Sequence, residues 1–463
     1  MSSATLMEDL PLQRFHLRVV LAGSGGQFND GFILGIVGIA LSVAATPLHL
    51  DATWIGLIGA ASLAGLFLGS FFVGPLADRF GRRSIFAYDM IIFALLSAGQ
   101  YFVTSPLQLL IFRVLLGLVL GADYAVAKSL VIEYLPRRSR GRLVSFLAVA
   151  WGIGYVAAYF VGYAIKEIDP HSWRMMLAIS GVPALLIIPA RLSIPESPLW
   201  LIKKDRVSDA LRIVQRTFGS HVTLDMRRSD GTGKRSANWS ALFTRKMRRN
   251  TLVGCVFFTC QVIPYFALGT FSPRVLQALH VENSLVGAMV YNALLILGLF
   301  MGLALIDRVP RRSFLIWTFY GGAVLLALLA STSISPMVTI VLFGLFACVL
   351  SGSTNAEPLY TAELFPTELR ATGTGFVIAC SRLGSAIATF LLPLAVQRFG
   401  IETSLLVCVG TLVFGGVFCH VFAPETRDVK LGELGSSIGP GEERLSPSAR
   451  MAGSIDRADR TLR

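Results

Sequence analysis

Four ionisable side chains lie deep inside apolar stretches of this chain, where they could bind a proton or a charged solute. Asp30 and Arg113 fall in the first half of the sequence, and Glu357 and Arg382 fall in the second. A charged side chain at the centre of a membrane costs several kcal/mol, so its presence there indicates a function. Arg382 lies about ten residues inside its stretch, too deep to reach water easily. We therefore expect it to meet a carboxylate, supplied either by Glu357 or by an anionic substrate.

Further polar residues within the apolar stretches are candidates for contacts with a solute. Asp123 and Lys128 are five residues apart on one predicted helix, so they face directions roughly 140° apart and need separate partners. Lys128 could instead extend its amine to the membrane surface, and Gln261 and Asn292 could instead hydrogen-bond between helices. Asp89, close to a predicted helix end, is interpreted as structural. The candidates for the substrate site are Gln27, Asp123, Lys128, Gln261, Asn292, Glu357 and Arg382.

Three short patterns occur twice, and each recurs 229 or 230 residues later. They are DRFGRRS at 78–84 and DRVPRRS at 307–313, a Glu-Pro-Arg pattern that begins at Glu133 and at Glu363, and Pro-Glu-Ser at 195–197 with Pro-Glu-Thr at 424–426. One offset shared by three patterns indicates two parallel halves. Alternating-access transporters are built from two such halves around a central site.

The acids and arginines of the repeated patterns could form ion pairs at the cytoplasmic ends of the helices. Such pairs would hold the two halves in an outward-facing state and would break when the inside opens. The arginines also act as signals of membrane orientation, but orientation alone does not explain acids at a fixed spacing from them. The predicted gating residues are Asp78, Arg79, Arg83, Glu133, Arg140, Asp307, Arg308, Arg312, Glu363 and Arg370.

The composition places the chain in a lipid environment. Hydrophobic residues make up 54% of the chain and charged residues 15%, against about a quarter charged in soluble proteins; the mean hydropathy is +0.65. Much of the net charge of +13 lies in alternate short loops. This bias predicts cytoplasmic termini and argues against a nucleic-acid partner.

The six cysteines lie in apolar segments without metal-ligand spacing and are interpreted as packing thiols. The beginning of the chain lacks a small-residue cleavage site, so no cleaved signal peptide is expected.

A membrane-spanning helix needs about 20 mostly apolar residues, and twelve stretches meet this requirement. They are 17–46, 54–77, 84–103, 106–134, 143–165, 173–194, 250–273, 284–306, 313–331, 335–364, 372–397 and 402–423. We expect an all-α membrane protein with an N-terminal six-helix half at 1–194, a cytoplasmic central loop at 195–249, a C-terminal six-helix half at 250–423 and a cytoplasmic tail at 424–463. The central loop is expected to carry amphipathic helices near anionic lipid, and the polar tail is expected to be disordered.

Several motifs resemble those of the major facilitator superfamily. The segment 74–83 is similar to the family signature between helices 2 and 3, and Arg-x-x-x-Gly-x-x-x-Gly at 113–121 is similar to its helix-4 motif. Pro-Glu-Ser-Pro-Leu-Trp at 195–200 and Pro-Glu-Thr at 424–426 resemble the two half-terminal motifs of the sugar-porter branch. The resemblance covers about residues 15–430.

Two further stretches narrow the resemblance. Gly-Ala-Asp-Tyr at 121–124 and Ser-Arg-Leu-Gly at 381–384 resemble bacterial metabolite transporters of the sugar-porter-like group and the branch that includes organic-ion carriers. The resemblance implies twelve helices in two pseudo-symmetric halves, proton-coupled or facilitated transport, and a substrate site between the halves.

The resemblance also suggests a partner for the acid of the first helix. Arg113 matches the family arginine that neighbours the helix-1 acid, which here is Asp30. If the two residues pair, the guanidinium holds Asp30 ionised, and protonation of Asp30 frees the arginine. This would be a minimal switch for proton coupling. The alternative is a static ion pair that holds two helices together.

The chain departs from sugar porters at expected sugar contacts. Asp30 lies three residues earlier than the acid of the sugar-porter Phe-Gly-Tyr-Asp stretch, and only Gln261 remains of a helix-7 glutamine pair. Pro358 stands where helix 10 would carry a tryptophan that stacks on the sugar ring. These differences favour a substrate other than a hexose.

We therefore expect a monomeric secondary transporter of the bacterial inner membrane that couples an organic acid or sugar acid to protons. The alternatives are a sugar or polyol porter and, from another class, a membrane solute sensor on a transporter scaffold. An enzyme is not expected, because the sequence has no phosphate loop, no Ser-His-Asp set and no metal-ligand spacing. The expected partners are the solute, the proton and the lipid bilayer, with no cofactor and no metal.

Overall fold

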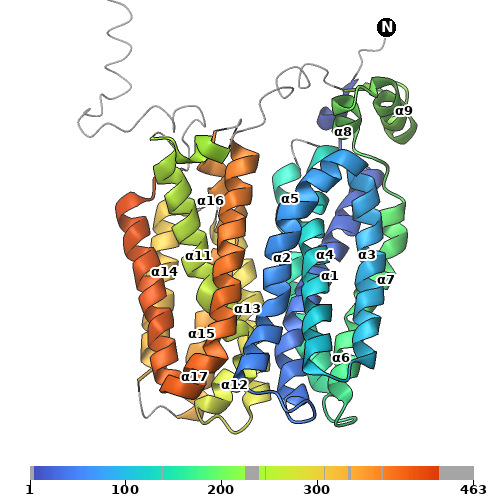
Figure 1. The fold of residues 1–463 in the computed structure, drawn as a ribbon. Helices are drawn as coiled ribbons and strands as arrows, with labels where there is room; N and C mark the ends of the chain where they lie inside the picture. Colours follow the sequence, from blue (N-terminus) through green and yellow to red (C-terminus); the bar gives the residue numbers. More distant parts are fainter. Residues whose placement is uncertain are drawn as a thin grey trace, which may run out of the picture.

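The chain forms two groups of long helices that lie side by side, with a small cap at one end (Figure 1). The computed structural model describes residues 5–136, 139–224, 239–245, 247–306, 308–331, 335–366 and 369–426. The first group comprises α1 (Arg14–Ala44), α2 (Ala52–Phe80), α3 (Arg82–Gly99), α4 (Pro106–Tyr134), α5 (Arg140–Ile165), α6 (Ser172–Ile179) and α7 (Gly181–Leu192). The second comprises α11 (Arg248–Thr270), α12 (Ser272–Ala278), α13 (Ser284–Leu305), α14 (Arg311–Leu329), α15 (Pro336–Ser353), α16 (Ala356–Glu363) and α17 (Arg370–Phe422). The remaining elements are α8 (Pro198–Lys203), α9 (Val207–Phe218), the strands β1 (Thr5–Leu6) and β2 (Val222–Thr223), and three 3₁₀ turns at Met7–Asp9, Gln100–Phe102 and Trp239–Phe243.

Within the described residues, eleven helical segments are long and apolar enough to cross a membrane. The last of them contains a turn at Gly400, whose φ of 82° and ψ of 167° are not helical. Glycine adopts positive φ without the steric cost that a Cβ brings. The turn separates 370–399 from 401–422, and each piece is long enough for one crossing. The expected all-α membrane fold is therefore confirmed, with crossings that correspond to the twelve predicted stretches.

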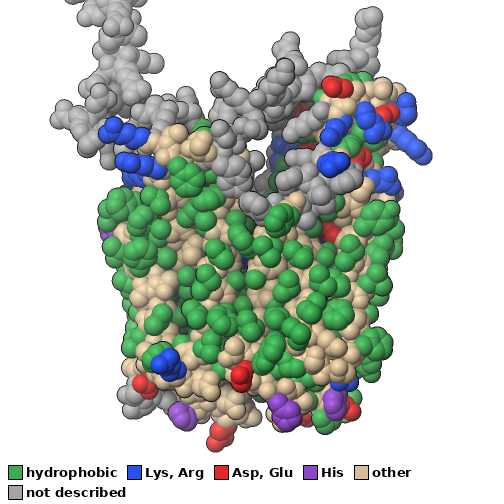
Figure 2. All heavy atoms as spheres, in the orientation of Figure 1, with side chains coloured by type: hydrophobic (Ala, Val, Ile, Leu, Met, Phe, Trp, Pro, Cys, Tyr) green, Lys and Arg blue, Asp and Glu red, His purple; other side chains and the backbone are tan. Residues whose placement is uncertain are grey.

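The sides of the molecule are apolar and its ends carry the charge (Figure 2). Leu186 of α7 and Trp317 of α14 are 76% and 74% exposed. Water would penalise so much exposed apolar surface, whereas hydrocarbon does not. Lys and Arg side chains gather at the end that carries α8 and α9, as Figure 2 shows.

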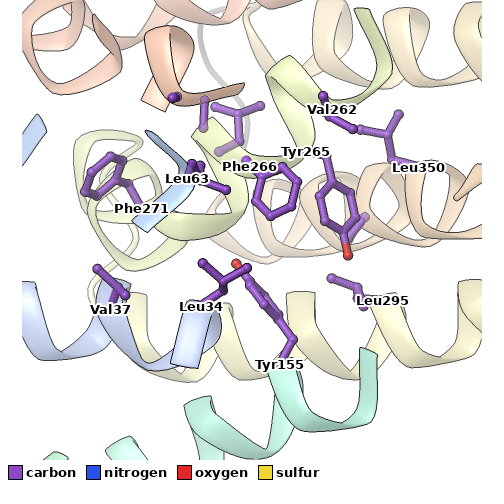
Figure 3. Packing of buried hydrophobic residues seen from close by; sticks show 14 of the residues in the cluster. Leu34, Val37, Leu63, Tyr155, Val262, Tyr265, Phe266, Phe271, Leu295 and Leu350 are labelled. Atoms are coloured by element: carbon purple, nitrogen blue, oxygen red, sulfur yellow. The ribbon is translucent and has the colours of Figure 1, made fainter. Parts of the chain in front are cut away.

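The two groups share one apolar core. α2 packs against α17 and α5 packs against α13. Figure 3 shows Leu34 of α1 and Tyr155 of α5 close to Tyr265 and Phe266 of α11. The core of each half is therefore continuous with that of the other.

Polar contacts join the halves at the end opposite α8 and α9. The Tyr159 hydroxyl of α5 donates to the carbonyl of Gly269 at 2.7 Å. Arg274 of α12 reaches the Leu41 carbonyl near the end of α1 at 3.5 Å. The halves are in contact on this side of the central region.

The start of the chain and the central connection build the cap on the first half. β1 and β2 pair in parallel. The apolar face of α9, formed by Ala210, Val214 and Phe218, is buried, and Phe218 meets the ring of Phe15 at 5.3 Å. The expectation that the amphipathic helices of the central loop lie on lipid is therefore wrong for α9, because protein covers its apolar face. The predicted disorder of the tail concerns residues that, from 427 on, lie outside the described part of the chain.

Glycines allow α2 and α4 to cross in close contact. A Cβ on Gly117 of α4 would lie 2.4 Å from the carbonyl oxygen of Ser62 and 2.8 Å from Cα of Gly65. A Cβ on Gly65 would in turn lie 2.4 Å from the Val114 carbonyl oxygen. In lipid no hydrophobic effect drives helices together, so close backbone contact is a main source of attraction.

Gly117→Ala should lower the stability of the purified protein, because the added methyl group forces α2 and α4 apart. Overpacking of this kind costs on the order of 1–3 kcal/mol. The matched control is Gly375→Ala in α17, where an added Cβ meets nothing within 4 Å. Apparent melting temperatures in detergent are the measurement. If both variants melt at the wild-type temperature, the crossing does not depend on the absence of a side chain.

Candidate functional site

A cavity lies between the two halves and is lined by polar and aromatic side chains. The first half contributes Gln27 from α1, Lys128 from α4 and Trp151 from α5. The second half contributes Glu357 from α16 and Arg382 from α17, together with aromatic rings from α11. Residues of both halves therefore face one space, as a transported solute requires.

Arg382 is surrounded by aromatic rings and forms no salt bridge with a carboxylate among the described residues; its electrostatic interaction is with Glu357, which lines the same cavity. Its guanidinium carbon lies 5.2 Å from the ring centroid of Phe266 and 5.8 Å from those of Tyr124 and Phe258. Ring faces attract the cation, but they leave its N–H groups without hydrogen-bond acceptors. Its Nε is buried and unpartnered. The guanidinium is thus positioned to bind an anion.

Two further charged groups face the same cavity. The Lys128 amine lies 5.0 Å from the ring centroid of Tyr124. Glu357 Oε1 accepts a hydrogen bond from Gln261 Nε2 at 3.2 Å, and the same amide donates to Ser353 Oγ at 2.7 Å. Gln261 therefore positions Glu357. The described lining of the cavity thus contains two cationic side chains and one acidic side chain.

A break between α15 and α16 brings Glu357 to the cavity wall. Pro358 has no N–H to donate to the carbonyl four residues earlier, so the helix is interrupted here. The polar side chains at the break bond to backbone carbonyls: Thr354 to Ser351 at 2.7 Å and Asn355 to Leu299 of α13 at 3.1 Å. Irregular backbone at membrane depth is tolerated where it is buried in protein or lines a cavity.

Three of the predicted substrate-site residues are not among those that line the cavity: Gln261 bonds to Glu357, and the other two lie elsewhere. Asn292 is buried in α13, where its Nδ2 donates to the Ala288 carbonyl of the same helix at 2.7 Å. It is not among the residues that line the cavity. Asp123 belongs to a cluster of charged residues inside the first half. Both predictions fail because the rotation of a helix, which the apolar pattern does not encode, decides which face meets the cavity.

The ion cluster consists of Asp30 of α1, Asp89 of α3, Asp123 of α4 and Arg191 of α7. Arg191 Nη1 donates to both carboxylate oxygens of Asp89, at 3.0 and 2.8 Å, and to Asp123 Oδ1 at 2.6 Å. All four side chains are at most 3% exposed. Gly26 provides the space, since a Cβ there would lie 1.5 Å from Arg191 Nη2. A buried guanidinium is stable only with hydrogen-bonded counter-charges, which this cluster supplies.

Asp30 stands at the edge of the ion cluster and connects it to the cavity. Its carboxyl group interacts with that of Asp123. Gln27 Nε2 donates to Asp30 Oδ2 at 3.0 Å. Because Gln27 also lines the cavity, one amide separates the cluster from the space between the halves.

The expected pair of Asp30 with Arg113 is wrong for this conformation. Arg113 Nη2 donates to the carbonyl of Ile33 at 3.0 Å, and its Nε and Nη1 are buried without partners. Arg113 lies ten residues before Asp123 on α4, or about 15 Å along the helix axis. Asp30 contacts Asp123, so it is level with a different turn of α4 from the one that carries Arg113.

Sequence reasoning overlooked Arg191 and interpreted Asp89 as structural. Arg191 lies close to the end of its apolar stretch, where an arginine is usually a topology signal at the membrane surface. The guanidinium of Arg191 occupies the space that Gly26 leaves open on α1. The sequence does not show that these two residues, far apart in the chain, are in contact.

At the α8–α9 end of the first half, the repeated patterns form one network. Glu133 of α4 contacts Arg82 and the hydroxyl of Ser197. Glu196 Oε1 accepts from the backbone N–H groups of Arg82 and Arg83 at 3.1 and 3.0 Å. These N–H groups begin α3, where a helix favours a negative charge. The third repeated pattern thus supplies the groups that the first two bind.

The second half repeats this network. Glu425 accepts from the backbone N–H groups of Arg311 and Arg312, at 2.9 and 3.1 Å. Thr426 Oγ1 donates to Glu363 Oε2 at 2.5 Å, and Arg311 Nε lies 3.8 Å from the same oxygen. Each contact described for these networks joins two residues of the same half. The expectation that the pairs hold one half to the other is not met by these contacts, which brace the helix ends within a half.

The remaining predicted gating residues lie around the two networks. Arg140 and Arg370 donate to backbone carbonyls nearby in the chain, at 2.9 and 3.0 Å. Arg79 is exposed near the end of α2, and Arg308 follows α13. Two predicted gating residues have side chains outside the described part of the chain: Asp78 and Asp307.

Comparison with known proteins supports the architecture. The sugar (and other) transporter family matches residues 21–436. The inner membrane metabolite transport protein YgcS of Escherichia coli is 38% identical, covering 96% of this chain and 99% of the relative. The niacin transporter NiaP of Acinetobacter baylyi is 27% identical, covering 94% of this chain and 100% of the relative.

A solved structure shares the fold. The xylose transporter XylE of E. coli, in a partially occluded inward-open conformation, superposes with a TM-score of 0.77 at 18% identity, covering 90% of this chain and 100% of that one. These matches identify a multi-pass membrane transporter and not an enzyme. The chain therefore belongs to the sugar (and other) transporter family of the major facilitator superfamily.

Proposed function

We propose that this protein is a monomeric proton-driven symporter of a small organic anion, an organic acid or a sugar acid, which it carries by alternating access. The observation that carries the proposal is Arg382, a buried arginine that faces the cavity and forms no ion pair with a described carboxylate. An arginine in the middle of a membrane costs about 2.5–3.5 kcal/mol even on insertion scales. A bound carboxylate would remove much of that cost through bidentate hydrogen bonds.

The charges around the cavity support an anion. Among the described residues that line the cavity, Arg382 and Lys128 are cations and Glu357 is the one acid. With all three groups ionised, the lining carries one net positive charge, which a single carboxylate would neutralise. A neutral sugar would leave that charge uncompensated in a low-dielectric space.

The apolar part of the lining fits the carbon skeleton of such a solute. Trp151 stacks on Tyr155 with ring centroids 5.5 Å apart and planes 21° apart, and Phe266 meets Trp151 edge-on at 6.2 Å. Flat aromatic surfaces next to a cation suit a carboxylate on an apolar or ring-shaped body. The niacin carried by one relative is a solute of this class.

A sugar or polyol is the second candidate. Trp151 could stack on a sugar ring, and Gln27 and Thr354 offer amide and hydroxyl groups to its alcohols. The fold is shared with a xylose transporter. The unpaired Arg382 is what favours the acid over this alternative.

The orientation follows from charge. Basic side chains gather at the α8–α9 end (Figure 2), and the positive-inside rule assigns such an end to the cytoplasm of the bacterial inner membrane. The two end networks would then gate the cytoplasmic side. They brace the helix ends within each half, so breaking them would loosen the half that contains them.

Arg382→Met should reduce the affinity for a carboxylate solute at least tenfold and leave that for a neutral analogue of the same shape almost unchanged. Methionine keeps the unbranched stem but removes the donors. The solute is first found by thermal-shift screening of carboxylates, sugar acids and sugars, because a ligand of the folded state raises its stability. The control is Arg398→Met, an exposed arginine of the same helix. Equal losses of affinity for both solutes would show that Arg382 has a structural role, and would favour a sugar as the substrate.

Asp30→Asn should abolish uphill uptake driven by a pH gradient while some counterflow exchange remains, because the amide cannot carry the proton. Uptake into proteoliposomes with and without an imposed gradient measures both. Asp51→Asn, an exposed acid that caps α2 through the Trp54 N–H, is the matched control, since asparagine caps equally well. Full accumulation by the Asp30 variant would remove Asp30 from the coupling mechanism.

Glu133→Gln should shift the protein toward the inward-open state, because it weakens the network with Arg82 and Ser197. A cysteine introduced at exposed Gln277, on the opposite side, should then react more slowly with a membrane-impermeant thiol reagent. Asp209→Asn is the control, because it breaks a surface ion pair with Arg206 at the same end. If labelling is unchanged in both variants, these charges serve orientation alone.

A further inference from the structure

We propose that Asp30 holds a proton in this conformation and donates it in a hydrogen bond to Asp123, which makes the ion cluster at Arg191 the proton-binding unit of the transporter. The inference rests on the proposed proton coupling and assigns it to a defined set of groups. The ion cluster is the set of Asp30, Asp89, Asp123 and Arg191 described above.

The cluster has more acids than its single base can balance. Three carboxyl groups surround the guanidinium of Arg191, and all are buried. If every group were ionised, the cluster would carry two net negative charges away from water. Adjacent like charges in a low-dielectric interior are strongly unfavourable, so such groups retain protons.

The geometry shows which acid is least stabilised as an anion. Asp89 accepts two hydrogen bonds from Arg191 and one from the backbone N–H of Met90 at 2.6 Å. Asp123 Oδ1 accepts from Arg191 at 2.6 Å. Among the described contacts, Asp30 accepts no hydrogen bond from the guanidinium and accepts only from the neutral amide of Gln27. The proton therefore belongs on Asp30.

Two ionised carboxylates cannot hydrogen-bond to each other, because each can only accept. The carboxyl group of Asp123 interacts with those of Asp30 and Asp89. Asp89 already accepts from Arg191 and from the Met90 N–H, whereas Asp30 Oδ1 is buried without a hydrogen-bond donor, as is Asp123 Oδ2. A proton on Asp30 lets this residue donate while Asp123 accepts.

The second half lacks the acids that bind Arg191. Under the repeat offset of 229 or 230 residues, Asp89 corresponds to Thr318, Asp123 corresponds to Ser353, and Arg191 corresponds to His420. The two carboxylates that hold Arg191 are therefore a feature of the first half alone.

Gln27 gives the proton a connection to the solute. Its amide contacts Asp30 and its side chain lines the cavity. The charged groups that face Asp30 are Asp123 and Lys128 from α4, Asp89 from α3 and Arg191 from α7.

A solute anion at Lys128 and Arg382 would place a further negative charge near Asp30 and so favour its protonated form. Linkage then requires the proton to favour anion binding equally. On release, the Asp30 O–H bond breaks and the proton passes to water in the cavity.

Infrared spectroscopy tests the location of the proton without any solute. Purified wild-type protein near neutral pH should show the carbonyl band of a buried protonated carboxyl group, which ionised carboxylates lack. Asp30→Asn should lose that band, and the exposed control Asp51→Asn should keep it. Glu357→Gln identifies any contribution from the acid in the cavity. The proposal is overturned if Asp30→Asn removes no protonated-carboxyl signal of its own.

Stability gives a second, independent measurement. Asp30→Asn should keep the wild-type apparent melting temperature, because a side-chain amide at this position can donate to Asp123 as the protonated carboxyl does. Asp89→Asn and Asp123→Asn should lower it, because each removes a counter-charge from Arg191. If Asp30→Asn destabilises the protein as much as Asp123→Asn, or prevents folding, Asp30 is an ionised member of the cluster and the proposal fails.

These outcomes are separate from those that test the transport function. A protonated Asp30 in a protein that accumulates its solute without a pH gradient would contradict proton-driven transport and leave the assignment of the proton intact. Proton-driven uptake by a protein whose infrared spectrum lacks the Asp30 signal would support proton-driven transport and contradict the assignment of the proton to Asp30.

Discussion

The absence of hydrogen-bonding solvent in a membrane determines how this protein is built. Every charged group that lies at membrane depth must find its partners inside the protein or in a cavity. Arg191 and Arg382 meet this constraint in opposite ways. Arg191 is held by Asp89 and Asp123, and its cluster joins α1, α3, α4 and α7 into one unit. Arg382 lies among aromatic faces and forms no salt bridge with a described carboxylate, so in the proposed function its donors bind the solute.

The two halves share a scaffold but differ in their interiors. The end networks are nearly identical, since Glu196 and Glu425 each bind the first backbone N–H groups of the helix that follows a repeated arginine pattern. Duplication therefore preserved the parts that brace the helix ends. The interiors have diverged, with the ion cluster in the first half and Arg382 and Glu357 in the second. If the proposed proton site lies in the first half and the solute also contacts Arg382 in the second, movement of the halves changes the distance between proton and solute, which suits coupling.

Close packing connects these charged sites to the rest of the fold. Gly26 makes room for the Arg191 guanidinium, and the glycine contact between α2 and α4 brings the backbone of the two helices together. Such contacts are rigid, because a packed interior has few alternative arrangements. The cavity lies where the helices of one half meet those of the other, and the break at Pro358 is tolerated there because Asn355 bonds to α13.

The sequence alone showed that the chain lies in lipid, which stretches cross the membrane and that the two halves repeat one pattern. The length of an apolar stretch and the spacing of a repeated motif can both be read directly along the chain. It also identified Arg382 as a charge too deep to reach water, and Gln27, Lys128 and Glu357 as candidates for the site. Only the tertiary structure decided which charges meet. Arg113 bonds to the Ile33 carbonyl, while Arg191, which resembles a surface arginine in the sequence, holds the acids. Which side chains meet between two helices depends on how far each helix is shifted along its axis and rotated about it. Packing across the whole bundle sets both.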